Sequence, residues 1–163
     1  MERIKQPNSR MCFICGLQNP AGLRMAFYQT EDGECVATVA PGEEYQGYPG
    51  VLHGGIVTAI LDETIGRAII GVDDRFAFTA KLEVKFHRPV PTGAPLTARG
   101  RIARERTLSF EATGEITLED GMVAASASGI YVRLPPHEVE RVRGELAFWQ
   151  VVPDDRPPRE SGC

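Results

Sequence analysis

The chain has 163 residues, which is enough for one domain with a substantial hydrophobic core. Apolar residues make up 42% of the sequence and charged residues 25%, as is typical of a globular protein. The formal net charge of −4 argues against nucleic acid or an anionic membrane as the main partner.

The N-terminal part of the chain is polar before it becomes strand-like. Residues 1–11 are rich in charged and polar side chains, and we expect them to be disordered. The segments Met25–Thr30 and Cys35–Ala40 flank Asp32-Gly33, a dipeptide typical of a tight hairpin turn. The sequence therefore predicts an antiparallel pair of strands here.

One long helix is predicted from about Gly54 to Ile70. Many of its residues are β-branched, which mildly disfavours helix, but about 17 residues is long for a strand. Val57, Ile60 and Leu61 also fall at helical spacing, and the pattern continues at Thr64 and Ala68. We therefore expect this helix to be largely buried.

Strands follow the helix. The segment from Phe78 to Val90 alternates apolar and polar residues, and two further alternating segments and a Gly-containing turn lead to MVAASASGIYVRL. From Leu82 to Leu134 this predicts an antiparallel meander of four strands. His137–Trp149 is a weaker helix candidate, and residues 151–163 are predicted to be a disordered tail. Residues 12–150 are then a single domain.

These elements predict an α+β fold in which a twisted antiparallel sheet of about six strands wraps around one long helix. The most apolar run, IVTAIL, is too short to cross a bilayer, and the first ten residues are not followed by the apolar core of a secretory signal. We therefore expect a cytoplasmic protein with no membrane partner.

The stretch HGGIVTAILDE, in this order of elements, resembles the hotdog-fold acyl-CoA thioesterases of the phenylacetate-degradation (PaaI-like) and thioesterase superfamily member 2-like type. The resemblance covers about Cys12 to Leu134. Its specific part is His53-Gly54-Gly55 at the start of the helix, with Asp62 nine residues after the histidine. The resemblance implies a hotdog fold, an acyl-CoA substrate, no cofactor, and a homodimer or homotetramer with active sites at the subunit interface.

Thioester hydrolysis needs donors for the developing oxyanion and a base or a carboxylate nucleophile. A helix N-terminus with Gly54 and Gly55 supplies free N–H groups, and the resemblance assigns the oxyanion contact to Gly54. Asp62 is the candidate base or nucleophile, and the choice between those roles stays open. It lies roughly 12 Å further along the axis, so two antiparallel helices would be needed to bring both groups to one carbonyl. Glu63 points about 100° away and is the weaker candidate.

Three further site residues follow from the resemblance. His53 is expected mainly to order the turn before the helix, with direct acid–base chemistry as the alternative. Thr79 matches a Ser or Thr that positions the attacking water. Many members carry an Asn before the HGG motif, where this chain has Gly47, and Gln46 is the candidate replacement for its amide.

The phosphates of coenzyme A attract cations. Lys85, His87 and Arg88 at the end of a predicted strand are the candidates, together with the pair Arg104 and Arg106. A solvated strand face is the ordinary alternative for such residues.

The four cysteines do not look like a disulfide framework, because only Cys12 and Cys15 are close in sequence. This lone CxxC lacks the second pair of a zinc site, which would have to come from Cys35 and a histidine or from partner subunits. We expect two thiols packed under the sheet and no metal.

Two other functions compete with hydrolysis. One is a hotdog dehydratase or hydratase acting on acyl thioesters, although the motifs that such enzymes need around a catalytic histidine are missing. The other is a non-catalytic acyl-CoA binding module, which the departure at Gly47 favours. Thiol release and enoyl-CoA hydration assays would separate the three.

Overall fold

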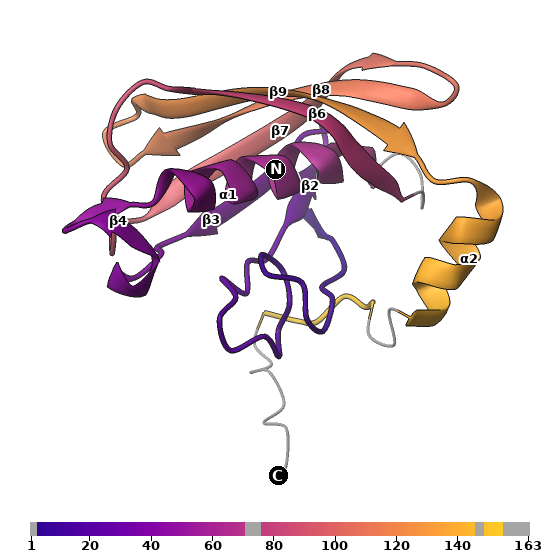
Figure 1. The fold of residues 1–163 in the computed structure, drawn as a ribbon, viewed down its shortest axis with the longest axis horizontal. Coiled ribbons are helices and arrows are strands. Elements are labelled where there is room, and N and C mark those ends of the chain that lie inside the picture. Colours follow the sequence, from indigo (N-terminus) through magenta and orange to yellow (C-terminus); the bar gives the residue numbers. More distant parts are fainter. Residues whose placement is uncertain (1–2, 71–75, 146–148, 155–163) are drawn as a thin grey trace, which may run out of the picture.

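The computed structural model describes residues 3–70, 76–145 and 149–154. Its main feature is a seven-stranded antiparallel sheet in the order β1-β2-β3-β7-β8-β9-β6, arched over the helix α1 (Figure 1). This is the predicted α+β hotdog arrangement. The strands are β1 (Arg3–Lys5), β2 (Tyr28–Thr30), β3 (Cys35–Val39), β6 (Ala77–Phe86), β7 (Leu96–Glu105), β8 (Ser109–Leu118) and β9 (Val123–Arg133).

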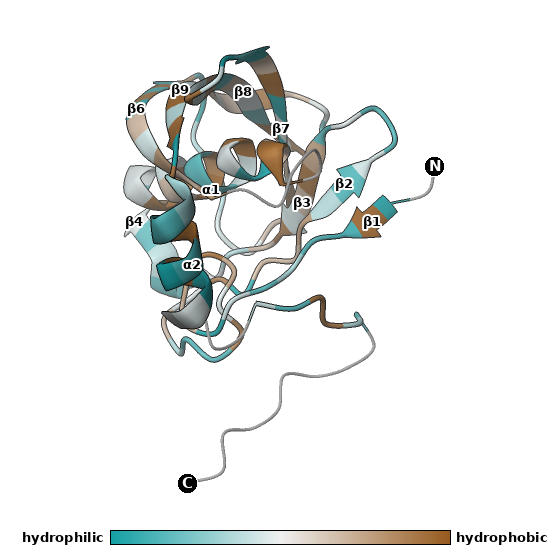
Figure 2. Ribbon diagram, turned by 90° about the vertical axis from the view of Figure 1, so that its right-hand side faces the viewer, coloured by the Kyte–Doolittle hydropathy of each residue, from teal (hydrophilic) through white to brown (hydrophobic). Residues whose placement is uncertain are grey.

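The remaining elements are short, apart from the two helices. Before α1 (Gly54–Gly66) come a 3-10 turn, η1 (Glu43–Tyr45), and a two-stranded ribbon of β4 (Gln46–Tyr48) and β5 (Val51–Leu52). A second 3-10 turn, η2 (Arg67–Ile69), extends α1, and α2 (Pro136–Glu145) follows β9. Figure 2 shows α2 as a mainly hydrophilic helix at one side of the molecule. None of the helices in the described ranges is long and apolar enough to cross a membrane.

The helix α1 is the centre of the hydrophobic core. Its residues Val57, Ile60, Leu61 and Thr64 are at most 2% exposed, so the helical spacing read from the sequence is confirmed. The helix changes to 3-10 geometry at η2, where Ala68 continues the buried face. The predicted helix thus occupies the predicted range, with a tighter last turn.

Two glycines let the sheet come close to α1. Gly100 on β7 and Gly114 on β8 are directly opposite each other in the sheet. A Cβ atom on Gly100 would lie 2.7 Å from the Thr64 carbonyl oxygen, and one on Gly114 would lie 2.4 Å from Ile65 Cγ2. The Gly100 backbone therefore packs on the α1 backbone, and Gly114 leaves room for the Ile65 side chain. No larger residue would fit at either position without a shift.

The predicted four-strand meander is wrong in its first strand. Strands β7, β8 and β9 pair in succession, but β6 pairs with β9 and forms one of the two edges of the sheet. The reason is that β3 and β8 already occupy both edges of β7, so β7 has none left for the strand that precedes it.

The N-terminal segment also differs from the prediction of disorder over residues 1–11. Strand β1 pairs with β2, and Gln6, Asn8 and Ser9 are buried with hydrogen-bond partners inside the protein. Polar composition predicted solvation here, whereas these side chains are satisfied internally. Figure 1 shows the segment between β1 and β2 on the side of α1 away from the sheet.

At the C-terminal end, Asp154 accepts hydrogen bonds from Tyr28 and Lys5. Residues 155–163, the larger part of the predicted tail, lie outside the described residues, as do residues 146–148 of the second predicted helix.

Candidate active site

The carboxylate of Asp62 is held by two hydroxyl groups from neighbouring strands. Thr79 on β6 donates to Asp62 Oδ1 at 2.8 Å, and Tyr131 on β9 donates to the same oxygen at 2.9 Å. Thr79 and Tyr131 are direct register partners across the β6–β9 pair, so their side chains reach the helix together. Within the described residues no donor contacts Asp62 Oδ2, which leaves that oxygen available for chemistry.

Tyr131 is a site residue that the sequence analysis missed. Its ring stacks on Phe110 with 5.0 Å between centroids and an interplanar angle of 10°. Gly66 and Gly129 form the slot for it, because a Cβ on either would lie 3.0 Å or less from the ring. Burial, followed by the negative charge of Asp62, raises the pKa of Tyr131, so the phenol stays a donor at neutral pH.

The N-terminus of α1 is capped by His53. Its Nδ1 accepts a hydrogen bond from the Gly55 N–H at 2.9 Å, so the ring is the tautomer that carries its proton on Nε2. Because the cap uses the Gly55 N–H, the adjacent Gly54 N–H is the available donor of the pair. No acceptor among the described residues binds the Gly54 N–H. The ring of Phe86 lies beside Gly54, 3.6 Å from where a Cβ would be.

Within one chain, Gly54 and Asp62 remain apart. They lie eight positions from each other on α1, roughly 12 Å along the axis. Glu63, the neighbouring acid, turns away from Asp62 and forms an ion pair with Arg67 at 2.7 Å. The two adjacent acids therefore have separate surroundings.

The other predicted site residues do not join Asp62 in one chain. Gln46 is exposed on β4, and its Oε1 accepts the Gly50 N–H at 3.4 Å. Lys85 lines a 440 Å³ hollow together with Glu83, Ser126 and Ser128. These residues alternate along β6 and β9 with the residues that pack on α1. The hollow therefore lies on the face of the sheet that is turned away from α1.

The two remaining cation candidates also have partners. His87 Nε2 lies 2.8 Å from Ser126 Oγ, and Arg88 pairs with Asp120 at 3.0 Å. Of the second pair, Arg106 lies 3.3 Å from Glu111. The role of these cations in binding phosphate stays a prediction.

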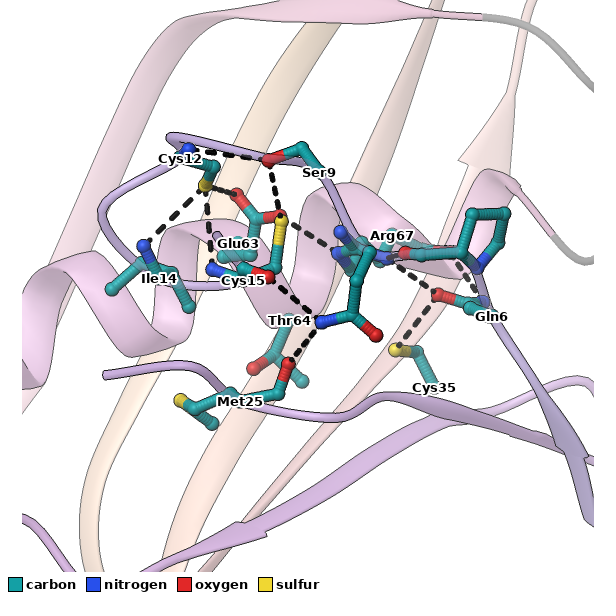
Figure 3. A network of polar contacts seen from close by, with 12 residues as sticks. Gln6, Ser9, Cys12, Ile14, Cys15, Met25, Cys35, Glu63, Thr64 and Arg67 are labelled. Carbon is teal, nitrogen blue, oxygen red and sulfur yellow. Dashed lines mark hydrogen bonds and ion pairs between the residues drawn. The ribbon is translucent and has the colours of Figure 1, made fainter. Parts of the chain in front are cut away.

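A pocket of about 260 Å³ opens beside Asp62, Thr79 and Tyr131. Its other wall carries the CxxC turn, which packs against α1 (Figure 3). Cys15 is buried and Cys12 half-buried. A hydrogen bond from Cys12 and the charge of Arg67 lower the pKa of Cys15 to about 6, while the pKa of Cys12 is raised.

Cys35 lies apart from this turn, with its sulfur 3.8 Å from Gln6 Oε1. Burial raises the pKa of its thiol to about 12. Among the described residues, Cys35 and the histidines therefore do not join Cys12 and Cys15 in a four-ligand zinc site.

Comparison with known proteins identifies the family. The pattern of the thioesterase superfamily matches residues 49–125, from just before the HGG motif to the start of β9. SSO2140 of Saccharolobus solfataricus, a candidate esterase, is 33% identical over 100 residues, which cover 61% of this chain and 71% of that protein. The acyl-coenzyme A thioesterase THEM4 of Bos taurus is 24% identical over 139 residues.

This chain spans only 56% of the length of bovine THEM4, although the match covers 84% of the chain itself. Among solved structures, the thioesterase superfamily protein RHA08564 matches with a TM-score of 0.70 and 31% identity, over 76% of this chain and 63% of that one. The fold, the family pattern and the relative with 33% identity agree. This chain belongs to the thioesterase superfamily.

Proposed function

We propose that this protein is an acyl-CoA thioesterase that hydrolyses an acyl- or aryl-CoA to the free acid and coenzyme A. The observation that carries the proposal is the half-buried Asp62 carboxylate, which is oriented through Oδ1 and free at Oδ2 beside a pocket. The name of bovine THEM4 supports acyl-CoA as the substrate class.

The reaction breaks the thioester C–S bond, and oxygen from water ends in the acid product. As a base, Asp62 takes a proton from the attacking water; as a nucleophile, its Oδ2 attacks the carbonyl and forms an anhydride that water then opens. In both cases the carbonyl oxygen becomes negative and needs a donor. The Gly54 N–H at the positive end of the helix dipole suits that role.

A second copy of the chain would complete the site. Strand β6, which carries Thr79, is a free sheet edge ten residues long, and Phe78 and Phe86 on it are more than half exposed. Long edges of this kind pair with other chains. A twofold axis beside β6 would run the two α1 helices antiparallel, so that each Asp62 faces its partner's Gly54 N–H. The pocket volume of 260 Å³ is small for a complete ligand site, as expected of half of one.

The test is a thiol-release assay with aryl, short, medium and long acyl-CoA substrates, run on wild type and on Asp62→Asn. We expect hydrolysis by wild type and a loss of at least about a hundredfold in Asp62→Asn, because the amide is neither a base nor a nucleophile. Glu63→Gln is the matched control, since its carboxylate faces Arg67 instead. Full activity in Asp62→Asn would refute the proposal, and tight acyl-CoA binding without thiol release by wild type would favour a binding module.

A further inference from the structure

A cluster of metal-binding side chains lies across the 260 Å³ pocket from the hydroxyls that hold Asp62. The sulfurs of Cys12 and Cys15 and one carboxylate oxygen of Glu63 all lie within 4.8 Å of one another (Figure 3). Ligand atoms around a tetrahedral zinc ion are separated by roughly 3.5–3.8 Å, given the usual zinc–sulfur and zinc–oxygen bond lengths. Cys12 Sγ and Glu63 Oε2 are already 3.9 Å apart.

The turn that carries the cysteines has the backbone arrangement of a metal-binding knuckle. The N–H groups of Ile14 and Cys15 both point at Cys12 Sγ, each at 3.4 Å, so two backbone donors are in place for a metal-bound thiolate. The Gly16 N–H closes the turn on the Cys12 carbonyl at 2.8 Å. A Cβ on Gly16 would lie 2.3 Å from that carbonyl oxygen, so the turn requires glycine.

The surroundings orient the third ligand and balance the charge. Arg67 holds Glu63 Oε1 at 2.7 Å, which leaves Oε2 facing the sulfurs. Second-shell contacts of this kind orient carboxylates in metal sites. With both thiols deprotonated, the cluster holds three negative charges and the one positive charge of buried Arg67, and a divalent cation cancels the remainder.

We propose that Cys12, Cys15 and Glu63 bind a zinc ion, with a solvent molecule from the adjoining pocket as the fourth ligand. Two thiolates with a carboxylate suit zinc better than magnesium or calcium, which prefer oxygen ligands alone. Binding releases the thiol protons and ties the CxxC turn to α1 one residue from Asp62. This differs from the prediction of no metal, because Glu63 is distant from the cysteines in sequence.

The test is zinc analysis of the purified full-length chain by mass spectrometry of the metal after incubation with zinc and removal of unbound ion. We expect one zinc per chain in wild type, loss of bound zinc in Cys12→Ser and Cys15→Ser, and weaker retention in Glu63→Gln. Cys35→Ser is the matched control, since its thiol lies outside the cluster, and it should retain zinc. Circular dichroism shows which variants are folded.

A second measurement uses wild type alone and needs no variant to fold. We expect cobalt in place of zinc to produce the absorption band of cobalt–thiolate bonds, and a chelator to expose two further thiols to a thiol reagent. Wild type that holds no zinc, a disulfide between Cys12 and Cys15 in its place, or folded Cys12→Ser that binds zinc like wild type would each overturn the proposal.

Discussion

Asp62 has one carboxylate oxygen held by two hydroxyls and a second to which no described residue donates a hydrogen bond. Hydrogen bonds from Thr79 and Tyr131 fix the side chain without removing its ability to act. Because both donors are register partners on adjacent strands, a change in either strand is transmitted to the carboxylate. In the proposed mechanism Thr79 and Tyr131 are positioning residues, and Asp62 is the group expected to meet the substrate.

We predict that Tyr131→Phe lowers kcat roughly tenfold or more and leaves KM nearly unchanged. The variant keeps the ring stacked on Phe110 and loses the hydroxyl, which contacts both the carboxylate and the backbone carbonyl of Asp62. A hydrogen bond to a charged group contributes about 1.5–3 kcal/mol. Steady-state kinetics of thiol release measures both constants. An unchanged kcat, or a rise in KM alone, would contradict a positioning role.

The sequence alone could suggest those residues of the proposed site that lie near each other along the chain. The HGG motif and Asp62 belong to one predicted helix and its start, and Thr79 was suggested by the family resemblance. Tyr131 could not be found in this way, since its contact with Asp62 depends on the β6–β9 register, which joins residues far apart in the sequence. The cluster around Glu63 was missed for the same reason.

At the scale of elements, the helix start and the helix-to-sheet contact each depend on particular glycines. Gly54 is the first residue of α1, where the backbone N–H has no partner within the helix. Gly100 and Gly114 allow α1 to lie directly on two strands. The spacing of apolar residues predicted the helix and its buried face. The order of the strands in the sheet could not be predicted from their order in the sequence, as the position of β6 beside β9 shows.

We predict that Gly54→Pro abolishes most of the activity while the protein stays folded. Proline is favoured at the first helical position, and His53 before it is already extended, with φ −60° and ψ 135°. The substitution removes the N–H, and losing one oxyanion donor costs about 10²–10³ in kcat. Gly54→Ala, which keeps the N–H, is the control, and its Cβ meets Phe86 at an ordinary 3.6 Å. Equal activity in the two variants would exclude this donor.

A second prediction at this scale concerns stability. Gly114→Ala should lower the free energy of unfolding by roughly 1–3 kcal/mol or more, because the new methyl overlaps Ile65 and the Arg99 carbonyl oxygen. Gly144→Ala on α2 meets nothing within 4 Å and should be neutral or stabilising by up to about 1 kcal/mol. Urea denaturation followed by circular dichroism compares them. If Gly114→Ala unfolds at the same urea concentration as wild type, the close contact does not matter for stability.

At the scale of the whole molecule, the proposed site requires two chains. One chain presents a positioned carboxylate at one end of α1 and a free N–H at the other, and the edge strand β6 beside Asp62 is open. The sequence indicated a site made from two chains, because the rise per residue of a helix already separates Gly54 from Asp62. That argument needs no tertiary information. It could not supply the choice between a dimer and a tetramer, which depends on surfaces contributed by several strands.

We predict that two inactive variants restore each other when their chains assemble together. Co-expression of differently tagged Asp62→Asn and Gly54→Pro chains should give about a quarter of wild-type activity, since half of the dimers are mixed and each has one intact site of two. Thiol release by the co-purified mixture is the measurement. Replacing the Gly54→Pro chain by the double variant is the control and should restore nothing. Inactive mixed dimers would show that the two residues do not serve one site.

The pairing of Asn8 with Gln150 has a consequence for the region around the CxxC turn. The two backbones exchange hydrogen bonds of 2.9 and 3.3 Å, while the Asn8 side chain donates to the carbonyls of Cys15 and Met25. The N-terminal segment around Asn8, which packs on α1, is thus hydrogen-bonded to a segment near the opposite end of the chain. A protease cut just before Gln150 would loosen the turn that holds Cys15. The reaction rate of the Cys15 thiol with a thiol reagent therefore reports whether the chain near Gln150 is intact.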